Sequence, residues 1–591
     1  MRQPSLKAFS SALVVLIIAE CVLGLPSTSA APAKSESLRD KTCLATPKQS
    51  PIRNLRLYIP LGVGAVASMA VGIISTTTPF IPCLLLAEFL VAAALFDWKA
   101  SQYQSLIADN TIDIDQYTCS RPSMYDRAKV VTLHGFSVGN HKRSLEPIKL
   151  GYQSSPFVKG LVATKRLQEG LSPMSLDLSK KPLVVGTIRM GFGHHRIAYS
   201  AASWGLASGS FTFFHDLLAV ESKEATLIKE ADKVYSKGSR LASELGGVIE
   251  ALWGSITKSG DASSLRCTYQ LAENLRPLLL DIPKDIPIIA THSLVGLVAV
   301  ACGFKNVINL VIDNYAQWFV IVPGAINLVQ GPTNYAMFHK MGVPTSELRL
   351  AGHWVPYDIV TNIDSDCERR RQRLKDEKPL RILLPVGGAG AQRKFVTSLL
   401  EALADEIKAG SVQVVLNAGD HAHMRDAFET SFKKMGLSSE DVTVFGDIDG
   451  VHNFCDEMRA GKEPRTGVTM FSFKDYFPAV AATDLLSRVV DVLACKPSEL
   501  AFYPVPKLMI RRVGDHEAYS ALRASELGDG TLEVREVKDA VEWIQLMKDN
   551  AGILDMMNDK IIANGKQGVY DGCKEAVRLA HELAGYKGSS E

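Results

Sequence analysis

The chain has no paired-cysteine motif and no excess of charge of either sign. Its ten cysteines are scattered singly from Cys21 to Cys573 without a C-x-x-C spacing, which argues against a disulfide scaffold and against a zinc ribbon. With 65 Lys and Arg against 63 Asp and Glu, the formal net charge is +2. No global field attracts nucleic acid, so no nucleic-acid partner is expected. Any anionic ligand must meet a local basic site.

The composition is that of a folded protein. Of the 591 residues, 47% are hydrophobic and 22% are charged, which excludes a disordered tail and a collagen-like chain. At about 100–200 residues per domain, this length predicts several domains.

The N-terminal segment has the order of a secretory signal. In residues 1–30, Arg2 and Lys7 precede an apolar stretch at 12–25 and a run of small residues. This order predicts a cleavable signal peptide, with an uncleaved membrane anchor as the alternative. Residues 31–56 are either a linker or the second half of a bipartite plastid-targeting signal.

An almost wholly apolar segment follows at residues 57–97. A break at Thr76-Thr77-Thr78-Pro79 divides it into two halves, each just long enough for a helix that crosses a bilayer. Arg53, Arg56 and Lys99 flank the segment, as expected when both ends face one compartment. The sequence therefore predicts a transmembrane hairpin with the lipid bilayer as a partner. The alternatives are a buried hairpin in a soluble protein and a single tilted span with a re-entrant turn.

After a connecting region (98–180), strand and helix patterns alternate. Alternation of this kind indicates parallel sheets with right-handed crossovers. The expected strands are 183–186, 211–214, 286–290 and 307–312, then 380–386, 412–416, 442–445 and 507–511; the expected helices are 197–206, 223–253, 394–409 and 480–492. The sequence thus predicts an α/β fold with two Rossmann-like domains, 181–370 and 371–547, that face a cleft. A charged connection at 364–378 separates the two series, residues 450–474 are expected to be an insertion, and residues 548–591 are expected to form C-terminal helices.

The first strand leads into Gly191-Phe192-Gly193-His194-His195-Arg196 and then a helix. The glycines permit a tight turn at the carboxyl end of a strand, where open α/β sheets bind ligands. A histidine at the start of the helix can act as a base on a hydroxyl, which makes His194 the candidate. A dinucleotide site is not expected, because Arg196 stands where the third glycine of that fingerprint belongs. The alternative is a structural turn with a surface histidine.

The second series starts with a similar turn. Its strand leads into Gly387-Gly388-Ala389-Gly390, with Arg393 and Lys394 at the start of the next helix. Backbone N–H groups and two cations at a helix N-terminus suit a diphosphate. The Lys-Ser/Thr of a nucleotide-binding P-loop is missing, and a plain strand–helix turn is the alternative.

A third element is Lys496-Pro497-Ser498-Glu499, followed after one strand by His516-Glu517. A carboxylate at position 499 can accept two hydrogen bonds from a ribose diol, and His516 and Glu517 can contact a sugar. The alternative is that Glu499 and Glu517 are capping or surface residues.

No metal site and no serine nucleophile are expected. The D-x-D pairs Asp364/Asp366 and Asp447/Asp449 are expected to lie in solvated loops. The His421/His423 pair lacks a third metal ligand, and His292-Ser293 lacks the glycines of a nucleophile elbow.

Taken in order, these elements over residues 181–547 resemble the GT-B glycosyltransferases. The similar group contains monogalactosyldiacylglycerol synthase, processive diacylglycerol glucosyltransferases and the N-acetylglucosaminyltransferase of the peptidoglycan lipid precursor. The resemblance implies that His194 assists deprotonation of the acceptor, that Glu499 binds a uridine ribose, and that the following residues surround them: on the acceptor side Gly191, Gly193, His195, Arg196 and Asp313; on the donor side Gly387, Gly388, Gly390, Arg393, Lys496, Ser498, His516 and Glu517.

The chain also departs from the family pattern. Phe192 replaces a glycine, and the Gly-rich stretch before the Ser-Glu helix is shorter, so that Lys496 takes its place. The implied activity is transfer of a hexose from a nucleotide sugar, a UDP-hexose, to a hydroxyl of a lipid or other membrane-associated acceptor, with no cofactor required. The alternatives are a nucleotide-sugar epimerase or hydrolase of the same fold and a membrane-tethered binding protein without activity. The expected location is a membrane reached through the secretory pathway, or the plastid envelope or thylakoid. The oligomeric state stays open.

Overall fold

The computed structural model describes residues 94, 96–138, 143–174, 177–230, 261–387 and 392–586. The expected signal peptide, the linker and nearly all of the expected hairpin therefore lie outside the described residues, as do Gly388, Gly390 and most of the helix expected at 223–253. Within the described ranges, no helix is both long enough and apolar enough to cross a bilayer.

The described chain divides into two units. The smaller one is helical, with α4 (Tyr103–Ile107), α5 (Ile114–Tyr117) and α6 (Met124–Val138). The hydroxyl of the buried Tyr103 donates a hydrogen bond to Asp115 Oδ1 at 3.0 Å. The larger unit holds both β-sheets and all predicted site residues.

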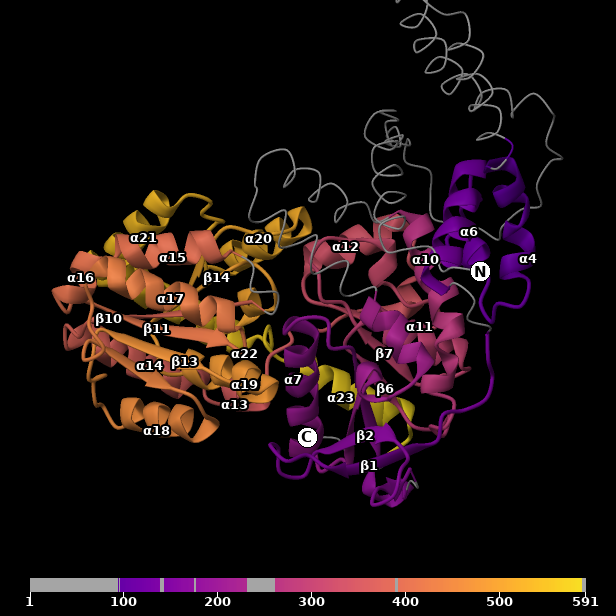
Figure 1. The fold of residues 1–591 in the computed structure, drawn as a ribbon, viewed down its shortest axis with the longest axis horizontal. Coiled ribbons are helices and arrows are strands. Elements are labelled where there is room, and N and C mark those ends of the chain that lie inside the picture. The colour runs from indigo at the N-terminus through magenta and orange to yellow at the C-terminus, as the bar shows by residue number, and fades with distance from the viewer. Residues whose placement is uncertain are drawn as a thin grey trace, which may run out of the picture. The chain divides into compact units, whose positions relative to one another are not determined.

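The first sheet of the larger unit has nine strands in the order β3-β1-β2-β5-β4-β6-β7-β8-β9. β1 is antiparallel to β2 and β3, and from β2 onward neighbouring strands are parallel. The strands are β1 (Leu150–Ser154), β2 (Val162–Arg166), β3 (Ser172–Pro173), β4 (Leu183–Thr187), β5 (Thr212–Asp216), β6 (Ile288–Ala290), β7 (Val307–Leu310), β8 (Ile326–Val329) and β9 (Leu348–Leu350); the main helices are α7 (Gly193–Ala207), α10 (Ala262–Asn274), α11 (Ser293–Ala301) and α12 (Pro332–Met341). Figure 1 shows this sheet and its helices in magenta tones.

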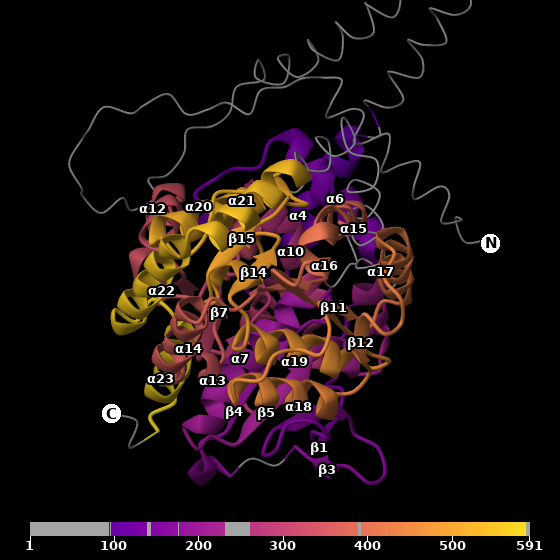
Figure 2. The same ribbon diagram turned by 90° about the vertical axis from the view of Figure 1, so that its left-hand side faces the viewer.

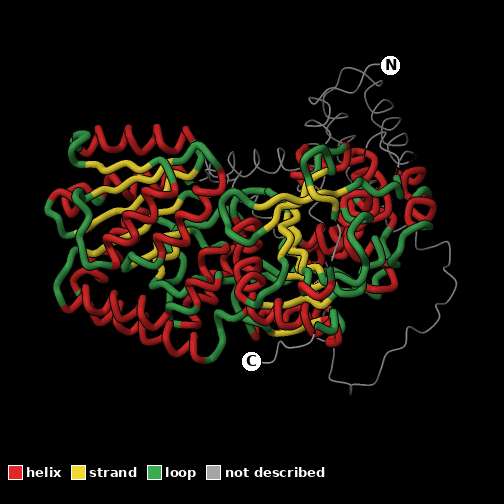
Figure 3. Tube along the Cα trace, turned by 90° about the horizontal axis from the view of Figure 1, so that it is seen from below, coloured by secondary structure: helices red, strands yellow, loops and turns green. Residues whose placement is uncertain are grey.

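The second sheet has six parallel strands in the order β12-β13-β11-β10-β14-β15. The strands are β10 (Leu380–Pro385), β11 (Val412–Gly419), β12 (Val442–Phe445), β13 (Val468–Ser472), β14 (Val492–Cys495) and β15 (Lys507–Met509); the helices are α13 (Tyr357–Val360), α14 (Ile363–Lys375), α15 (Arg393–Ala402), α16 (Ala404–Lys408), α17 (Ala422–Met435), α18 (Ile448–Arg459), α19 (Tyr476–Ser487), α20 (Ala518–Leu527), α21 (Val537–Asp549) and α22 (Ala551–Lys566). In Figure 3 the strands of the two sheets form two separate groups, each flanked by helices.

Helices cover both faces of the second sheet, which explains its apolar strands. Successive side chains of a strand point to opposite faces, so Leu383 packs into one apolar cluster while Ile382 and Leu384 pack into another. The first cluster includes residues of α14, α18 and α19, and the second includes residues of α15, α17 and α21. Figure 2 shows the same two layers with the strands between them. A strand buried on both faces reads as a continuous apolar run.

The predicted α/β fold with two Rossmann-like sheets is confirmed, but several predicted elements differ. The segment 450–474 is not an insertion, because it contains most of α18 and the internal strand β13. The connecting region 98–180 contributes β1, β2 and β3 to the first sheet. The helix expected at 480–492 ends at Ser487, and β14 begins at Val492. The charged connection at 364–378 is mostly helix α14, and the helix at 394–409 is split between α15 and α16.

The C-terminal helices do not form one block. α22 packs on the second sheet domain, whereas α23 (Gly572–Leu583) buries Cys573, Ala576 and Ala580 in the core of the first. Figure 1 shows this yellow helix beside the magenta strands. Where the chain crosses back, Gly572 N–H donates to the carbonyl of His353 at 3.0 Å. A Cβ on Gly572 would lie 2.5 Å from the carbonyl oxygen of Gly352, so the two crossing segments pack this closely only with glycine there.

Candidate functional site

The two glycine turns lie at the switch points of their sheets. The neighbours of β4 are β5 and β6, on opposite sides, and the neighbours of β10 are β11 and β14. The chain runs from β4 to β5 and later places β6 on the other side of β4, and it runs from β10 to β11 and later places β14 on the other side of β10. Open α/β sheets bind ligands outside the carboxyl ends of strands where the strand order reverses in this way. The loop after β4 consists of residues 188–192, and the described part of the loop after β10 ends at Gly387.

His194 is held firmly at the first turn. Gly191 adopts a φ of 79°, which glycine allows without strain. The imidazole Nδ1 of His194 lies 2.8 Å from the carbonyl oxygen of Thr291, and since a carbonyl only accepts, Nδ1 carries the proton. The hydroxyls of Thr187 and Thr291 both donate to the His194 carbonyl, at 3.3 and 3.2 Å. Burial lowers the pKa of His194 below its usual value. A neutral ring with a basic Nε2 results.

A second histidine, His292, lies directly against the first. Their ring centroids are 4.2 Å apart. His292 follows β6, the strand next to β4, and its Nδ1 accepts the N–H of Leu294 at 3.1 Å at the start of α11. Burial, and then the neighbouring His194, lower the pKa of His292 well below its usual value. The sequence motif His292-Ser293 gave no indication of this role, because it was interpreted only as lacking a nucleophile elbow. The signal that could have identified His292 is its position just after β6, the strand that lies next to β4 in the parallel sheet.

Two carboxylates approach His194. Asp313 and Glu499 both partly offset the effect of burial on the pKa of His194. Asp313 follows β7 in the first sheet, and its Oδ1 lies 4.0 Å from Nε2 of His516, in the second domain. The structure thus brings the predicted acceptor-side Asp313 and donor-side His516 together.

Glu499 lies between the two predicted half-sites. A Cβ on Gly193 would lie 3.1 Å from Glu499 Oε2, so the missing side chain at position 193 leaves room for this carboxylate. Glu499 opens a short 3-10 helix (Glu499–Phe502), and Ser498 precedes it without capping it through its side chain. The third predicted element therefore lies against the first glycine turn.

Arg196 is occupied by the protein itself. Its side chain is only 2% exposed, NH1 lies 2.5 Å from Asp484 Oδ1, and Nε lies 3.7 Å from Glu499 Oε1. NH1 also donates to the carbonyl of Val480 at 3.0 Å. Burial opposes the charge, but Asp484, Tyr503 and Glu499 raise the pKa of Arg196 above its usual value. Arg196, predicted on the acceptor side, therefore ties α7 to the second domain.

His195 also points into the protein. It is 4% exposed, and its ring packs edge-on against Phe214 and Tyr476. Its Nε2 lies 3.3 Å from Oδ2 of Asp216. His195 is therefore buried among Phe214, Tyr476 and Asp216, and its role on the acceptor side stays a prediction.

The second turn and the third element are neighbours as well. A Cβ on Gly387 would lie 3.4 Å from Cε of Lys496. Lys496 Nζ donates to Glu517 Oε1, while Glu517 Oε2 accepts the Val513 N–H at 2.7 Å. Burial raises the pKa of Glu517, but Lys496 and His516 outweigh it and keep that pKa below its usual value. Glu517 is thus an ionised partner of Lys496.

The remaining predicted donor-side cation, Arg393, lies at the start of α15. Arg393 is the first residue of α15 and is exposed, like Lys394 after it. Their place at the N-terminus of α15 suits an anion, because the backbone N–H groups there lack helical partners.

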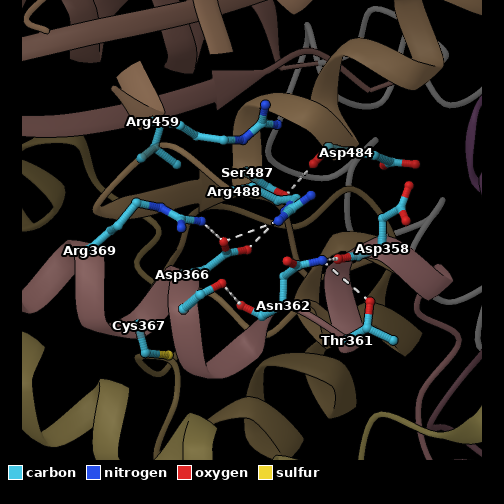
Figure 4. Close-up of polar contacts among 12 residues, drawn as sticks. Asp358, Thr361, Asn362, Asp366, Cys367, Arg369, Arg459, Asp484, Ser487 and Arg488 are labelled. Atoms are coloured by element: carbon cyan, nitrogen blue, oxygen red, sulfur yellow. Dashed lines mark hydrogen bonds and ion pairs between the residues drawn. The ribbon is translucent and has the colours of Figure 1, made fainter. Parts of the chain in front are cut away.

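The D-x-D pairs are structural. Figure 4 shows Asp366 in α14 between Arg369 and Arg488, whose Nε lies 3.0 Å from Asp366 Oδ2. Asp366 is 3% exposed, so the expected solvated loop is wrong there. Asp447 caps α18 by accepting the Gly450 N–H at 2.7 Å. Within the described ranges, no group of three His, Cys, Asp or Glu side chains is arranged to hold a metal ion.

Comparisons with known proteins give two family matches and several similar structures. Residues 140–340 match the domain of unknown function DUF6937, and residues 343–581 match the domain of unknown function DUF6938. No curated protein sequence matches the chain.

The solved structures that are similar share little sequence with the chain. One is a UDP-GlcNAc 2-epimerase from Neisseria meningitidis bound to UDP-GlcNAc, at 11% identity and a TM-score of 0.38, covering 68% of this chain and 99% of that one. A glycosyltransferase from Rickettsia africae has 10% identity and a TM-score of 0.35, covering 69% and 100%. An α,α-trehalose 6-phosphate synthase from Burkholderia multivorans has 11% identity and a TM-score of 0.36, covering 70% and 99%.

Proposed function

We propose that the protein transfers a hexose from a nucleotide sugar, a UDP-hexose, to a hydroxyl of a lipid or other membrane-associated acceptor. The observation that carries the proposal is the meeting of a neutral, anchored His194 with Glu499 across Gly193. A base and a ribose-binding carboxylate are then within one site, next to a helix N-terminus suited to a diphosphate.

The second domain binds the donor in this proposal. Glu499 accepts hydrogen bonds from the ribose hydroxyls, as the resemblance to GT-B glycosyltransferases implies. The amides at the start of α15, with Arg393 beside them, face the diphosphate and stabilise the charge that develops on it. Lys496, next to Gly387 and paired with Glu517, supplies a further cation at this turn.

The first domain activates the acceptor. The acceptor hydroxyl gives its proton to Nε2 of His194 while its oxygen bonds to the anomeric carbon of the sugar. The bond between that carbon and the diphosphate breaks, and its electron pair leaves with the nucleoside diphosphate. Residues 57–97 supply the argument for a membrane acceptor, because a hairpin there would hold the site near lipid. Passage through the secretory pathway or into a plastid is part of the same proposal.

The test is incubation of the purified full chain with radiolabelled UDP-glucose, UDP-galactose, UDP-N-acetylglucosamine and GDP-mannose in the presence of total membrane lipid. Label in the organic extract, lost in His194→Ala, is expected. Label released as free sugar would identify a hydrolase, and an epimerised nucleotide sugar would identify an epimerase. Calorimetry with UDP is the companion measurement. Absence of UDP binding would show that the protein has no donor site and would favour a binding protein without activity.

A further inference from the structure

The pairing of His194 with His292 carries an inference that rests on the proposed function and deepens it. Their rings are in contact, with centroids 4.2 Å apart, at the ends of two adjacent parallel strands. Each ring uses its Nδ1 for a hydrogen bond to the protein backbone. In the described part of the chain, neither Nε2 has a protein partner.

The backbone bonds fix the two rings in opposite tautomers. His194 Nδ1 faces a carbonyl oxygen, so this nitrogen bears the proton and Nε2 has a free lone pair. His292 Nδ1 accepts the N–H of Leu294, so this nitrogen is unprotonated and Nε2 bears the proton in the neutral ring. One ring therefore offers an acceptor and its neighbour offers a donor.

The surroundings keep both rings neutral and give the pair no net positive charge. Burial lowers the pKa of both histidines, and His195 lowers that of His194 further. The carboxylates of Asp313 and Glu499 act in the opposite direction on His194 but do not reverse the shift. The nearby guanidinium of Arg196 is engaged by Asp484.

We propose that His292 is a second catalytic residue, whose Nε2–H donates a hydrogen bond to the acceptor hydroxyl while Nε2 of His194 accepts the proton of that hydroxyl. A hydroxyl has one proton to give and two lone pairs, so one pair can accept from His292 and the other can attack the sugar. The substrate class that fits is a neutral alcohol. A carboxylate or a phosphate dianion offers only acceptors, leaves His194 Nε2 unpaired and meets the carboxylates of Asp313 and Glu499.

The proton positions are tested without any assay of activity. In the full chain labelled with ¹⁵N-histidine, the imidazole signals of His194 and His292 are assigned from the spectra of His194→Gln and His292→Gln. We expect His194 to be protonated at Nδ1 and His292 at Nε2, with neither ring cationic at pH 7. The same tautomer in both rings, or an imidazolium at pH 7, overturns the proposal.

Ligand class is tested on the same samples. Octyl glucoside, which is a neutral polyol, is expected to shift the signals of both histidines, whereas octyl phosphate is not. A response to octyl phosphate alone, or to neither probe, overturns the inference, and both probes are read without turnover. Failure of sugar transfer with intact tautomers and an octyl glucoside response would overturn only the proposed function.

Turnover then separates a contact with substrate from a structural role. His292→Gln keeps an N–H near the position of Nε2, and His292→Phe keeps a ring without one. Loss of one neutral hydrogen bond corresponds to about a tenfold rise in KM for the acceptor in His292→Phe, with His292→Gln within about twofold of the parent. His339→Gln, an exposed residue of α12, is the matched control. Equal KM values in His292→Phe and the parent, or equal losses in both His292 variants, overturn the role of the Nε2 proton.

Discussion

The carboxyl edges of the two sheets differ in how they hold charge. At the first edge, burial lowers the pKa of His194 and His292 and keeps both rings neutral, and Arg196 is buried against Asp484. At the second edge, Arg393 is exposed at a helix N-terminus, and Lys496 is paired with an ionised Glu517. The difference fits the division of tasks in the proposed function, in which the first edge handles a proton and an uncharged acceptor and the second edge handles the diphosphate.

The largest effect is expected from His194→Ala. This variant removes the base from the first edge and leaves the second edge intact, so kcat should fall about a hundredfold to ten-thousandfold with little change in the Kd for UDP. Initial rates of sugar transfer and calorimetry with UDP measure the two quantities, with His339→Ala as control. If the rate is unchanged, the first edge is not the catalytic one.

Arg196→Met tests the connection between the two edges. Removal of one partner from a buried ion pair typically costs about 3–5 kcal/mol, because the partly buried Asp484 would keep the hydrogen bond from the Tyr503 hydroxyl but lose the positive charge that compensates it. Urea unfolding followed by circular dichroism should show this loss, and Arg425→Met, on the exposed surface of α17, should not. The double variant Arg196→Met with Asp484→Leu should recover most of the loss. A double variant less stable than Arg196→Met would show that packing, and not the charge, is responsible.

Glu499→Gln reverses the pattern expected for His194→Ala. Weaker hydrogen bonds to the ribose should raise the Kd for UDP about tenfold to a hundredfold, with a smaller change in kcat at saturating donor. Glu542→Gln, on an exposed face of α21, controls for the loss of one negative charge. Calorimetry with uridine should show the same change as UDP, since the ribose is common to both. A rise in Kd for UDP but not for uridine would indicate that Glu499 acts on the diphosphate and not on the ribose.

The smallest effect is expected from pH. His194 must be neutral to accept a proton, and its pKa lies below the usual 6.5. Activity should therefore hold above pH 6.5 and decline only as the pH falls through the lowered pKa. Between pH 8 and pH 6.5 the loss of kcat/KM should stay below about twofold. A pH profile of kcat/KM whose midpoint lies above pH 6.5 would contradict a neutral His194 at the first edge. The His292→Gln variant should show no loss of kcat/KM at high pH.

Sequence patterns identified the central strands because these strands are apolar on both faces. Strands β1 and β2 were missed because they carry polar residues such as Gln153 and Lys165, and the short, buried β8 was missed as well. β13 was missed because polar residues precede it, so that the segment resembled an insertion. The helix expected at 480–492 was drawn too long because apolar residues continue without a break from the end of α19 into β14.

The candidate site was predictable where a short motif carries it and not where distant segments meet. His194, Gly193 and Glu499 follow from local spacing at strand ends. Asp484 and Tyr503 did not stand out, because their importance comes from Arg196, which is far away in the sequence and takes Asp484 as its partner. The buried setting of His195 depends in the same way on Asp216 and Tyr476, which no local pattern links to it.

The return of α23 to the first domain limits how the protein can be divided. The two matched families meet between residues 340 and 343, yet α23 lies in the second match and covers the core of the first domain. A gene cut at this junction would give a first half with an uncovered apolar surface, and exposed surface of that kind favours aggregation. The two halves are therefore expected to be soluble only when they are produced together, or when the first half is fused to residues 568–586.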